Sequence, residues 1–460
     1  MRENSSRIPV AICFFASLLA LTLVAAPAAP AGASNKCKPV QGADLQSCNF
    51  SKQNLSGLNF SNANLSGAKL NKSNLSQDDF SGAVLVGVNL SGANLSDTDL
   101  ISANLTNANL TGAVLTGSQL GNVIMKDAIL RGVSSGGIVI SPLLATFPLH
   151  WGFINGYLVG PYADLKNANI DDGAGSNPEY GTFVPGAKVL NFDFSGANLT
   201  NANFNNSVVT DDDFNGAKLG GANFTDANVT SDSFAGANFL DASGETDSFE
   251  YDPMPLNDDN FTEAKLNGAD FAGTAMSNDV FVDANLTGAD LSGDGDFDNP
   301  VSNDNFTSAN LTAATLGGSY GPGGAIYGTN ITADDFTNAI FTKAILVGSG
   351  AEELTVSPAP LNGNNFTDAK FSATSMSHID LSDNIFLRAV LTGEALNGDN
   401  FTGDNLTKAN LTKANLTNTN LTSALFTGAV LTGVISGGSI GTPAALPNGW
   451  SLGDGVLLHD

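Results

Sequence analysis

The chain has 460 residues, with 45 Asp and Glu residues against 18 Lys and Arg residues and a formal net charge of −27. This one-sided charge argues against nucleic acid or an anionic membrane as a partner, because both attract Lys and Arg. Net charge bears on solubility and partners and does not decide the fold.

Residues 1–33 are typical of a secretory signal peptide. Arg2 and Arg7 precede an apolar run from Val10 to Ala26, and the small residues Ala31-Gly32-Ala33 follow. We expect cleavage after Ala33, with an uncleaved membrane anchor as the alternative. No later apolar run is long enough to span a membrane. The mature protein is therefore expected to be secreted or extracytoplasmic and to make no membrane contact after cleavage.

Two cysteines remain after the signal peptide, because Cys13 lies within it. An even pair in an oxidising compartment predicts a disulfide between Cys37 and Cys48. That bond would tie an N-terminal cap, residues 34–42, over the open end of the fold that begins at residue 43. Two free or buried thiols are the alternative.

Residues 43–130 repeat with a period of five. Every fifth residue from Leu45 to Leu130 is Leu, Phe or Met, without a slip in register. On a helix a step of five turns roughly 140°, and in a flat strand an odd step alternates sides, so neither structure gives these residues a common face. They all point inward only if the chain turns a quarter circle every five residues. Such a chain winds into coils of about twenty residues, stacked at roughly 4.8 Å.

The repeat breaks at residues 131–162, and a similar segment ends the chain at residues 434–460. Each copy has a Gly-Gly pair followed by two prolines, a Trp, a Gly and a Leu, which align with one two-residue gap. The second copy predicts a C-terminal cap, because an open solenoid exposes apolar core and strand edges. The first copy either closes an N-terminal block or bulges as a loop from one continuous rod. A Trp-centred ligand pocket is a third interpretation.

Residues 163–433 form a second repeat block with interruptions. Asp or Asn recurs two places before a Phe, and several of the spacings are twenty residues, or one full coil, which predicts a single column of Phe rings on one face. The pairs run from Asp212/Phe214 through Asp232/Phe234, Asp259/Phe261, Asp279/Phe281, Asp304/Phe306, Asp334/Phe336 and Asn364/Phe366 to Asn384/Phe386. Irregular stretches near 241–258, 292–303, 317–328 and 347–362 are expected on one side of the rod. The inward Asp residues cannot all be ionised in a dry interior. Hydrogen bonds to backbone N–H groups are expected to hold them, with cation binding as the alternative.

The repeated unit Ala-Asn-Leu-Thr-x, most regular from Asp399 to Leu421, resembles the repeat of the pentapeptide-repeat proteins. This resemblance implies an all-β, right-handed quadrilateral β-helix, built as one rod or two stacked blocks. Many members of that family have no assigned function, so the resemblance implies a fold more than a role.

The sequence contains no catalytic constellation, so we expect neither an enzyme nor a bound cofactor. His150, His378 and His459 lie far apart and outside hydrolase and metal-ligand motifs. The alternating carboxylates Asp294, Asp296 and Asp298 could converge on calcium. The run departs from the EF-hand loop, with Asn299 in place of the required Gly and Asn305 in place of the bidentate Glu. A solvated acidic loop is the default interpretation.

These observations favour an exported, non-catalytic scaffold with an unknown protein or surface ligand. Oligomers could form through the solenoid ends. One alternative is adsorption to an ordered surface such as ice, glycan or mineral through arrays of Ser, Thr and Asn. Another, implied by the family resemblance, is a DNA mimic that inhibits or protects DNA gyrase, although a signal peptide would separate it from that enzyme.

Overall fold

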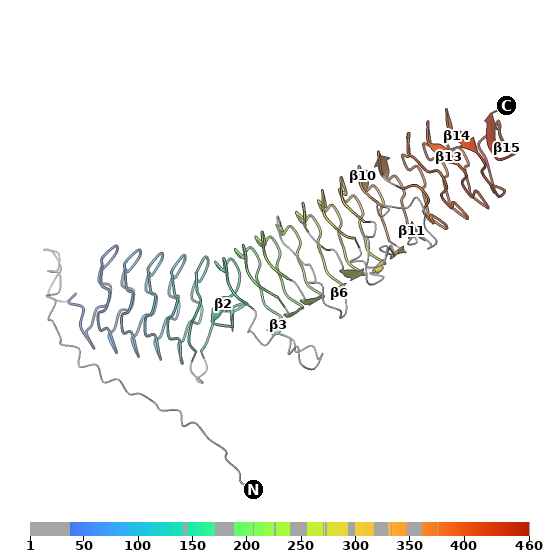
Figure 1. Ribbon diagram of the computed structural model, residues 1–460. Coiled ribbons are helices and arrows are strands. Elements are labelled where there is room, and N and C mark those ends of the chain that lie inside the picture. Colours follow the sequence, from blue (N-terminus) through green and yellow to red (C-terminus); the bar gives the residue numbers. More distant parts are fainter. Residues whose placement is uncertain are drawn as a thin grey trace, which may run out of the picture.

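The computed structural model describes residues 37–140, 145–170, 188–205, 207–224, 227–239, 255–269, 271, 274–292, 300–316, 330–332, 334–346, 361–374 and 376–459. These residues wind into a long rod of stacked coils (Figure 1). Each coil has four short edges that pair in parallel with the coils before and after it. The predicted right-handed quadrilateral β-helix is confirmed.

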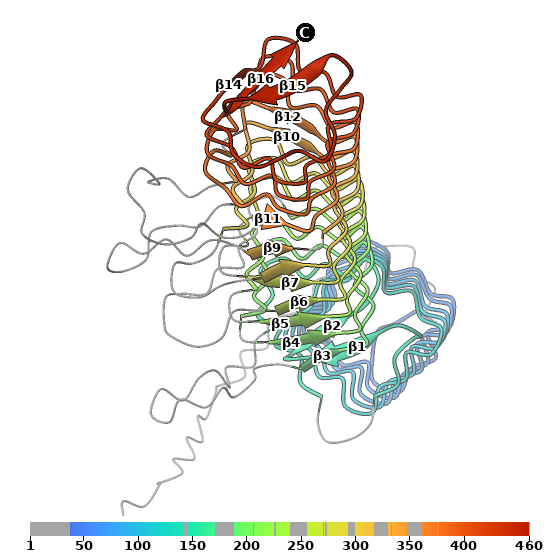
Figure 2. The same ribbon diagram turned by 90° about the vertical axis from the view of Figure 1, so that its right-hand side faces the viewer.

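Most of this pairing is made by single residues at the centre of each edge, so named strands are few and short. They are β1 (Gly152–Ile154), β2 (Tyr157–Val159), β3 (Lys188–Leu190), β4 (Val208–Thr210), β5 (Asn228–Thr230), β6 (Pro255–Asn257), β7 (Ala275–Ser277), β8 (Pro300–Ser302), β9 (Asn330–Thr332), β10 (Ile340–Thr342), β11 (Leu361–Asn362), β12 (Lys370–Ser372), β13 (Asn415–Thr417), β14 (Ile435–Gly437), β15 (Trp450–Gly453) and β16 (Val456–His459). Strands β3 to β9 and β11 form one eight-stranded parallel sheet along a single side of the rod (Figure 2).

The parallel pairing on one edge runs without a break through both repeat blocks. We call this edge the long ladder. Its members are Asn54, Asn74, Asn94, Val114, Ser134, Asp164, Asn198, Lys218, Asn238, Lys265, Asn285, Asn310, Ile340, Lys370, Val390, Asn410 and Val430. The step from Ser134 to Asp164 spans most of the segment that interrupts the repeat. This segment therefore leaves the long ladder continuous.

The interior, in contrast, is divided into two apolar cores at the hairpin of β1 and β2. These strands pair antiparallel. Leu158 packs into the core that begins at Leu45, whereas Ile154 and Val159 pack into the core that ends at Leu457. The hairpin is thus a layer between two stacked coils, and the rod bends near it (Figure 1).

The C-terminal hairpin of β15 and β16 repeats this arrangement with one side uncovered. Leu457, the counterpart of Leu158, is buried against the last coil. Leu458 is 49% exposed, whereas its counterpart Val159 is fully buried under the next coil. Two similar hairpins therefore lie in different settings, one between two coils and the other against a single coil.

Two polar contacts join the internal hairpin to the coil that follows it. The side-chain amide of Asn155 donates to the carbonyl of Asn169 at 2.9 Å, and the N–H of Asn169 donates to the Tyr157 hydroxyl at 3.1 Å. In the C-terminal copy Asp454 and Val456 take these two places. Neither side chain can reproduce its counterpart's contact, because a carboxylate does not donate and Val has no polar atom.

The predicted column of Phe rings is confirmed, and Phe194 extends it by one member. Phe194, Phe214, Phe234, Phe261, Phe281, Phe306, Phe336, Phe366 and Phe386 stack face to face, with neighbouring ring centroids 4.7–5.1 Å apart. Consecutive members lie between 20 and 30 positions apart in the sequence. The stacking therefore shows that the coil geometry is restored after each interruption.

Candidate functional site

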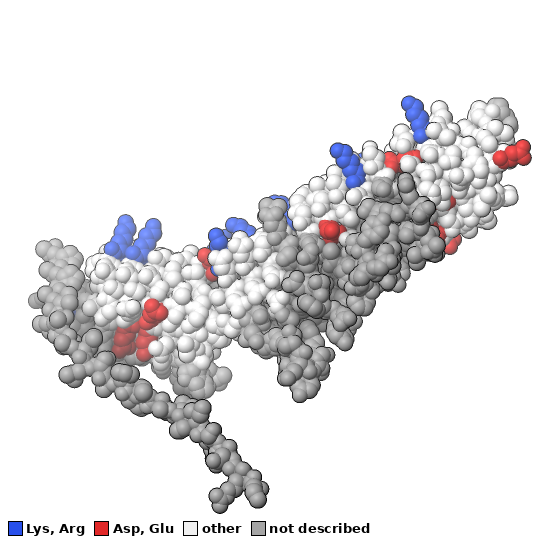
Figure 3. Space-filling view, in the orientation of Figure 1, with Lys and Arg blue, Asp and Glu red and all other residues white. Residues whose placement is uncertain are grey.

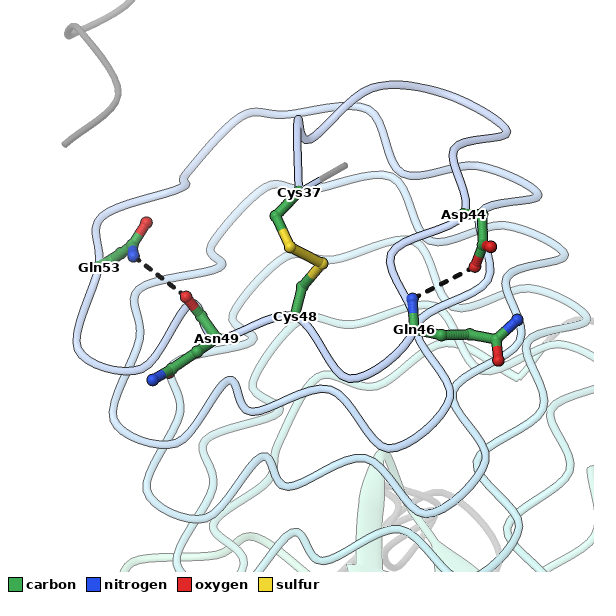
Figure 4. The surroundings of a disulfide bond; sticks show 6 residues. All are labelled: Cys37, Asp44, Gln46, Cys48, Asn49 and Gln53. Atoms are coloured by element: carbon green, nitrogen blue, oxygen red, sulfur yellow. Dashed lines mark hydrogen bonds between the residues drawn. A yellow bond between two sulfur atoms is a disulfide. The ribbon is translucent and has the colours of Figure 1, made fainter. Parts of the chain in front are cut away.

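The first coil is closed by a disulfide between Cys37 and Cys48 (Figure 4). Cys48 occupies the inward place two residues before Phe50, and its side chain is buried. The bond joins residues 11 apart in the sequence and ties the start of the described chain to the core.

Replacing both cysteines by Ser is expected to loosen the first coil. Closing a loop of this length stabilises a fold by about 3 kcal/mol in the chain-entropy model. Because coils interact only with their neighbours, the loss should stay local. Amide hydrogen exchange should therefore speed up in residues 43–65 and remain unchanged in residues 400–431. Equal changes at both ends would contradict this local role.

The candidate calcium residues Asp294, Asp296 and Asp298 lie outside the described residues. Among the residues that are described, no group of three or more His, Cys, Asp or Glu side chains could hold a metal ion. Nor does any described segment form a helix long and apolar enough to cross a membrane. The irregular stretches predicted on one side of the rod lie largely outside the described residues as well. Described segments flanking several of them end at Leu316 and Leu346 and resume at β9 and β11.

The outer Asn and Thr side chains bond to one another. The Thr312 hydroxyl donates to Oδ1 of Asn310 at 2.7 Å. The amide of Asn310 donates in turn to the Thr287 hydroxyl of the preceding coil at 3.1 Å. Similar pairs recur along the rod, as at Asn365 and Thr337. These side chains link each coil to the next by hydrogen bonds. Many of their O–H and N–H groups therefore already donate within the rod.

Charged side chains are sparse between these polar ladders. On the side drawn in Figure 3, Lys and Arg side chains gather along one edge of the rod, and few Asp and Glu side chains are visible. The interior accounts for part of this sparseness, because ten carboxyl groups of the described residues are buried. They belong to Asp78, Asp212, Asp232, Asp259, Asp279, Asp304, Asp334, Glu394, Asp399 and Asp404.

Seven of the buried aspartates and two asparagines form a continuous inward column, which we call the Asp column. Its members are Asp212, Asp232, Asp259, Asp279, Asp304, Asp334, Asn364, Asn384 and Asp404. In each, Oδ1 accepts a hydrogen bond of 2.5–2.9 Å from a backbone N–H of the preceding coil. After the first member, that N–H belongs to the preceding member of the column. The expected bonding of inward Asp residues to backbone N–H groups is thus confirmed for this column.

The second carboxyl oxygen distinguishes two parts of the Asp column. Oδ2 of Asp212 accepts a further bond from the N–H of Thr210 at 3.2 Å, and Asp232 and Asp259 are bonded in the same way. In the remaining aspartates Oδ2 is buried without a hydrogen-bond partner. These are Asp279, Asp304, Asp334 and Asp404.

Burial raises the pKa of every aspartate in the Asp column. The values reach about 7 for Asp232 and Asp304, about 8 for Asp212 and Asp279, and about 9 for Asp259, Asp334 and Asp404. For several members a neighbouring carboxyl raises the pKa further, and bonds from backbone N–H groups lower it. Two ionised carboxylates at strand spacing would repel by about 3 kcal/mol at an effective dielectric constant of 20.

Sequence reasoning identified most of the Asp column. It placed Asp399 and Asp404 two residues before Phe401 and Leu406 but did not assign Asp404 to the column, which it traced through Phe. It did not single out Asp78 and Glu394, which take the equivalent inward place on other edges. The sequence signal for a buried acid is its position two places before the central apolar residue of a repeat. It does not depend on whether that apolar residue is Phe or Leu.

Comparison with known proteins finds the repeat in this chain. The family model described as pentapeptide repeats matches residues 41–77, 63–100, 79–117, 93–132, 186–211, 193–230, 260–293 and 396–433. Among the curated proteins none matches.

Several similar solved structures are also pentapeptide repeat proteins. HetL, involved in heterocyst differentiation regulation in the cyanobacterium Nostoc sp. strain PCC 7120, is 23% identical, with 62% of this chain and 93% of HetL covered and a TM-score of 0.23. A protein of the Arabidopsis thaliana thylakoid lumen is 32% identical over 22% of this chain and 72% of its own, with a TM-score of 0.22. Rfr23 of the cyanobacterium Cyanothece 51142 is 39% identical over 22% and 65%, with a TM-score of 0.19.

Proposed function

This chain belongs to the pentapeptide-repeat family, and from that premise we propose that it acts as an exported, non-catalytic scaffold. The observation that carries this proposal is the long ladder from Asn54 to Val430. Continuous pairing of this kind favours a stiff rod, whose outer side chains lie at a fixed spacing of about 4.8 Å. Such a rod can hold a partner protein or a surface ligand at a defined place.

The position of the acids supports a structural role for them. Catalysis by a carboxyl group requires it to lie within hydrogen-bond reach of a substrate. The members of the Asp column are at most 3% exposed, and they accept bonds from the backbone of the neighbouring coil. Their hydrogen bonds thus connect coils.

The two alternative functions have weaker support. Adsorption to ice, glycan or mineral needs outer hydroxyl groups that are free to bond, whereas hydroxyls such as that of Thr312 already donate within the rod. Mimicry of DNA needs dense negative charge on the surface. Among the described residues ten acids lie in the interior, so the surface carries less charge than the composition indicates.

Export is tested by expressing the full chain in its source cells and locating it by fractionation. Mass spectrometry of the recovered protein should find an N-terminus at Ser34, next to the predicted cleavage site after Ala33. Recovery of the uncleaved chain from the cytoplasm alone would overturn export. It would leave the scaffold role to be judged separately.

The scaffold role is tested by photo-cross-linking from two opposite sides of one coil. Thr402 and Thr412 lie ten residues apart, each bonded to its own Asn, so a photoreactive residue at either place keeps a similar environment. A partner held on one side should be captured reproducibly from one position and not from the other. Absence of any specific adduct from either position would contradict a binding scaffold.

A further inference from the structure

The two asparagines show what the environment of the Asp column accepts. Oδ1 of Asn364 accepts the N–H of Asp334 at 2.9 Å, as a column aspartate does. Its Nδ2 donates to the carbonyl of Ile331 at 3.0 Å, and Nδ2 of Asn384 donates to the carbonyl of Leu361 at 2.8 Å. At these two members, the site therefore supplies one N–H donor and one carbonyl acceptor.

Neutral side chains at the equivalent inward place on other edges also donate to a carbonyl. The hydroxyls of Thr98, Thr374 and Thr419 donate to the carbonyls of Leu95, Phe341 and Leu416, at 2.8–2.9 Å. Donation from this inward place is thus a repeated feature of the fold. It is not universal, because the inward hydroxyls of Ser207 and Thr274 are buried without a partner.

A carboxylic acid fits this place better than a carboxylate does. A protonated carboxyl has one O–H donor besides its acceptor oxygen, whereas a carboxylate only accepts. Asp279, Asp304, Asp334 and Asp404 keep Oδ2 buried without a partner, and their side chains are at most 2% exposed. A charged oxygen left in this state is costly, whereas a proton on Oδ2 supplies the kind of donor that the asparagines use.

We propose that the aspartates of the Asp column whose Oδ2 has no partner, from Asp279 to Asp404, bind protons, and that losing these protons at alkaline pH loosens their coils more than it loosens the first block. The ligand is the proton itself. The first block, residues 43–130, has a single buried acid among its described residues, Asp78. The two blocks should therefore respond differently to pH although they share one fold.

The charged surroundings of the Asp column act in the same direction. Besides column members, the groups that raise its pKa values are Asp211 near Asp212 and Asp232, Asp258 near Asp279, and Asp380, Asp383 and Asp399 near Asp404. All of them are carboxyl groups, so each disfavours ionisation of its neighbour. None of them supplies a positive charge to replace the proton.

The sign of the pH effect follows from the direction of these shifts. Burial raises the pKa of Asp334 from 3.8 to about 9. A proton held more tightly by the folded state stabilises it, and this contribution is complete below about pH 4. Above pH 4 the factor by which this proton favours the folded state in the folding equilibrium falls tenfold per pH unit. The stabilisation is lost as pH rises through about 9. The same holds for the other aspartates of the column up to their own values of about 7 to 9.

Two adjacent residues provide a matched pair of variants. Asp334 points inward, whereas Asp335 lies on the outer surface and accepts from the Thr337 hydroxyl at 2.6 Å. Infrared titration of the purified full chain should show a carboxylic-acid carbonyl band at pH 6 that fades between pH 7 and pH 9. D334N should lack one carboxyl's share of this band, and D335N should keep it. A wild-type protein with no such band at pH 6 would overturn the proposal.

Hydrogen exchange, corrected for the intrinsic effect of pH, tests the consequence for the rod. Between pH 6 and pH 9 the opening equilibrium near residue 334 should rise by up to about a thousandfold for each column proton lost on opening. D334N should remove the part of this rise that comes from the Asp334 proton, whereas D335N should leave the rise unchanged. In residues 43–130 any rise should be confined to the coils around Asp78, because burial raises the pKa of that single acid to about 8. Equal loosening throughout both blocks would contradict the proposal. If D334N fails to fold, the infrared band of the wild-type protein and the comparison of hydrogen exchange between its two blocks still test the proposal.

Discussion

Replacing Phe261 by Ala is expected to destabilise the second block by about 3–5 kcal/mol, the range observed for truncating buried aromatic residues. Phe261 is 1% exposed, and its ring stacks between Phe234 and Phe281 with centroids 4.9 Å away on both sides. The substitution removes apolar burial and two stacking contacts, each of which contributes about 0.5–1.5 kcal/mol. Equilibrium unfolding in urea measures the loss.

The location of the damage makes this experiment specific. Each coil contacts only its neighbours, so hydrogen exchange should speed up from β6 to β7 and around Phe234, and much less beyond these coils. Phe261→Leu is the control, because it keeps most of the apolar volume and should cost less than about 1.5 kcal/mol. A loss below about 1 kcal/mol for Phe261→Ala would show that this ring does not support the stack.

The five-residue period determined which side chains point inward. A quarter turn per repeat points the central apolar residue and the residue two places before it into the interior. The period therefore placed the Phe column and Cys48 inside. The same argument extends to Asp404, which lies two places before Leu406 and was left outside the column only because the column was traced through Phe. Inward direction is thus a local property that a single repeat can reveal.

Pairing between coils after an interruption could not be predicted in this way. Ser134 pairs with Asp164, and Asp164 pairs with Asn198, at separations of 30 and 34 residues instead of 20. No period relates these residues, so one rod and two stacked blocks remained open from sequence. The structure combines both, with two apolar cores and one continuous ladder. The hairpin between them explains how a break in the core can leave an edge intact.

Composition also gave an incomplete picture of charge. The formal net charge of −27 counts every acid as ionised. In the part of the chain that the structure describes, ten carboxyls are buried, and among the aspartates of the Asp column the pKa values reach about 7 to 9. The folded protein near neutral pH should therefore be less negative than its sequence indicates. Which acids are buried depends on position within the repeat, and a sum over the whole chain does not contain that information.

The paired hairpins allow one substitution to be compared in two settings. Leu158 and Leu457 hold corresponding places in the two copies, and both are buried. Truncating either to Ala should cost about 2–5 kcal/mol, because a buried Leu is lost and a cavity is left. The loss should have different consequences, since Leu158 lies where two cores meet and Leu457 lies at the end of one.

Leu158→Ala is expected to weaken the coupling between the two blocks, so that thermal unfolding followed by calorimetry separates into two transitions. The β1–β2 hairpin contacts both cores, and destabilising it removes the apolar contact through which one block supports the other. The long ladder remains, but single-residue pairing on one edge gives less cooperativity than a shared core. Leu457→Ala should instead leave the main transition in place and speed up exchange in β15 and β16 alone. If both variants gave the same calorimetric profile, the internal hairpin would not be the element that couples the blocks.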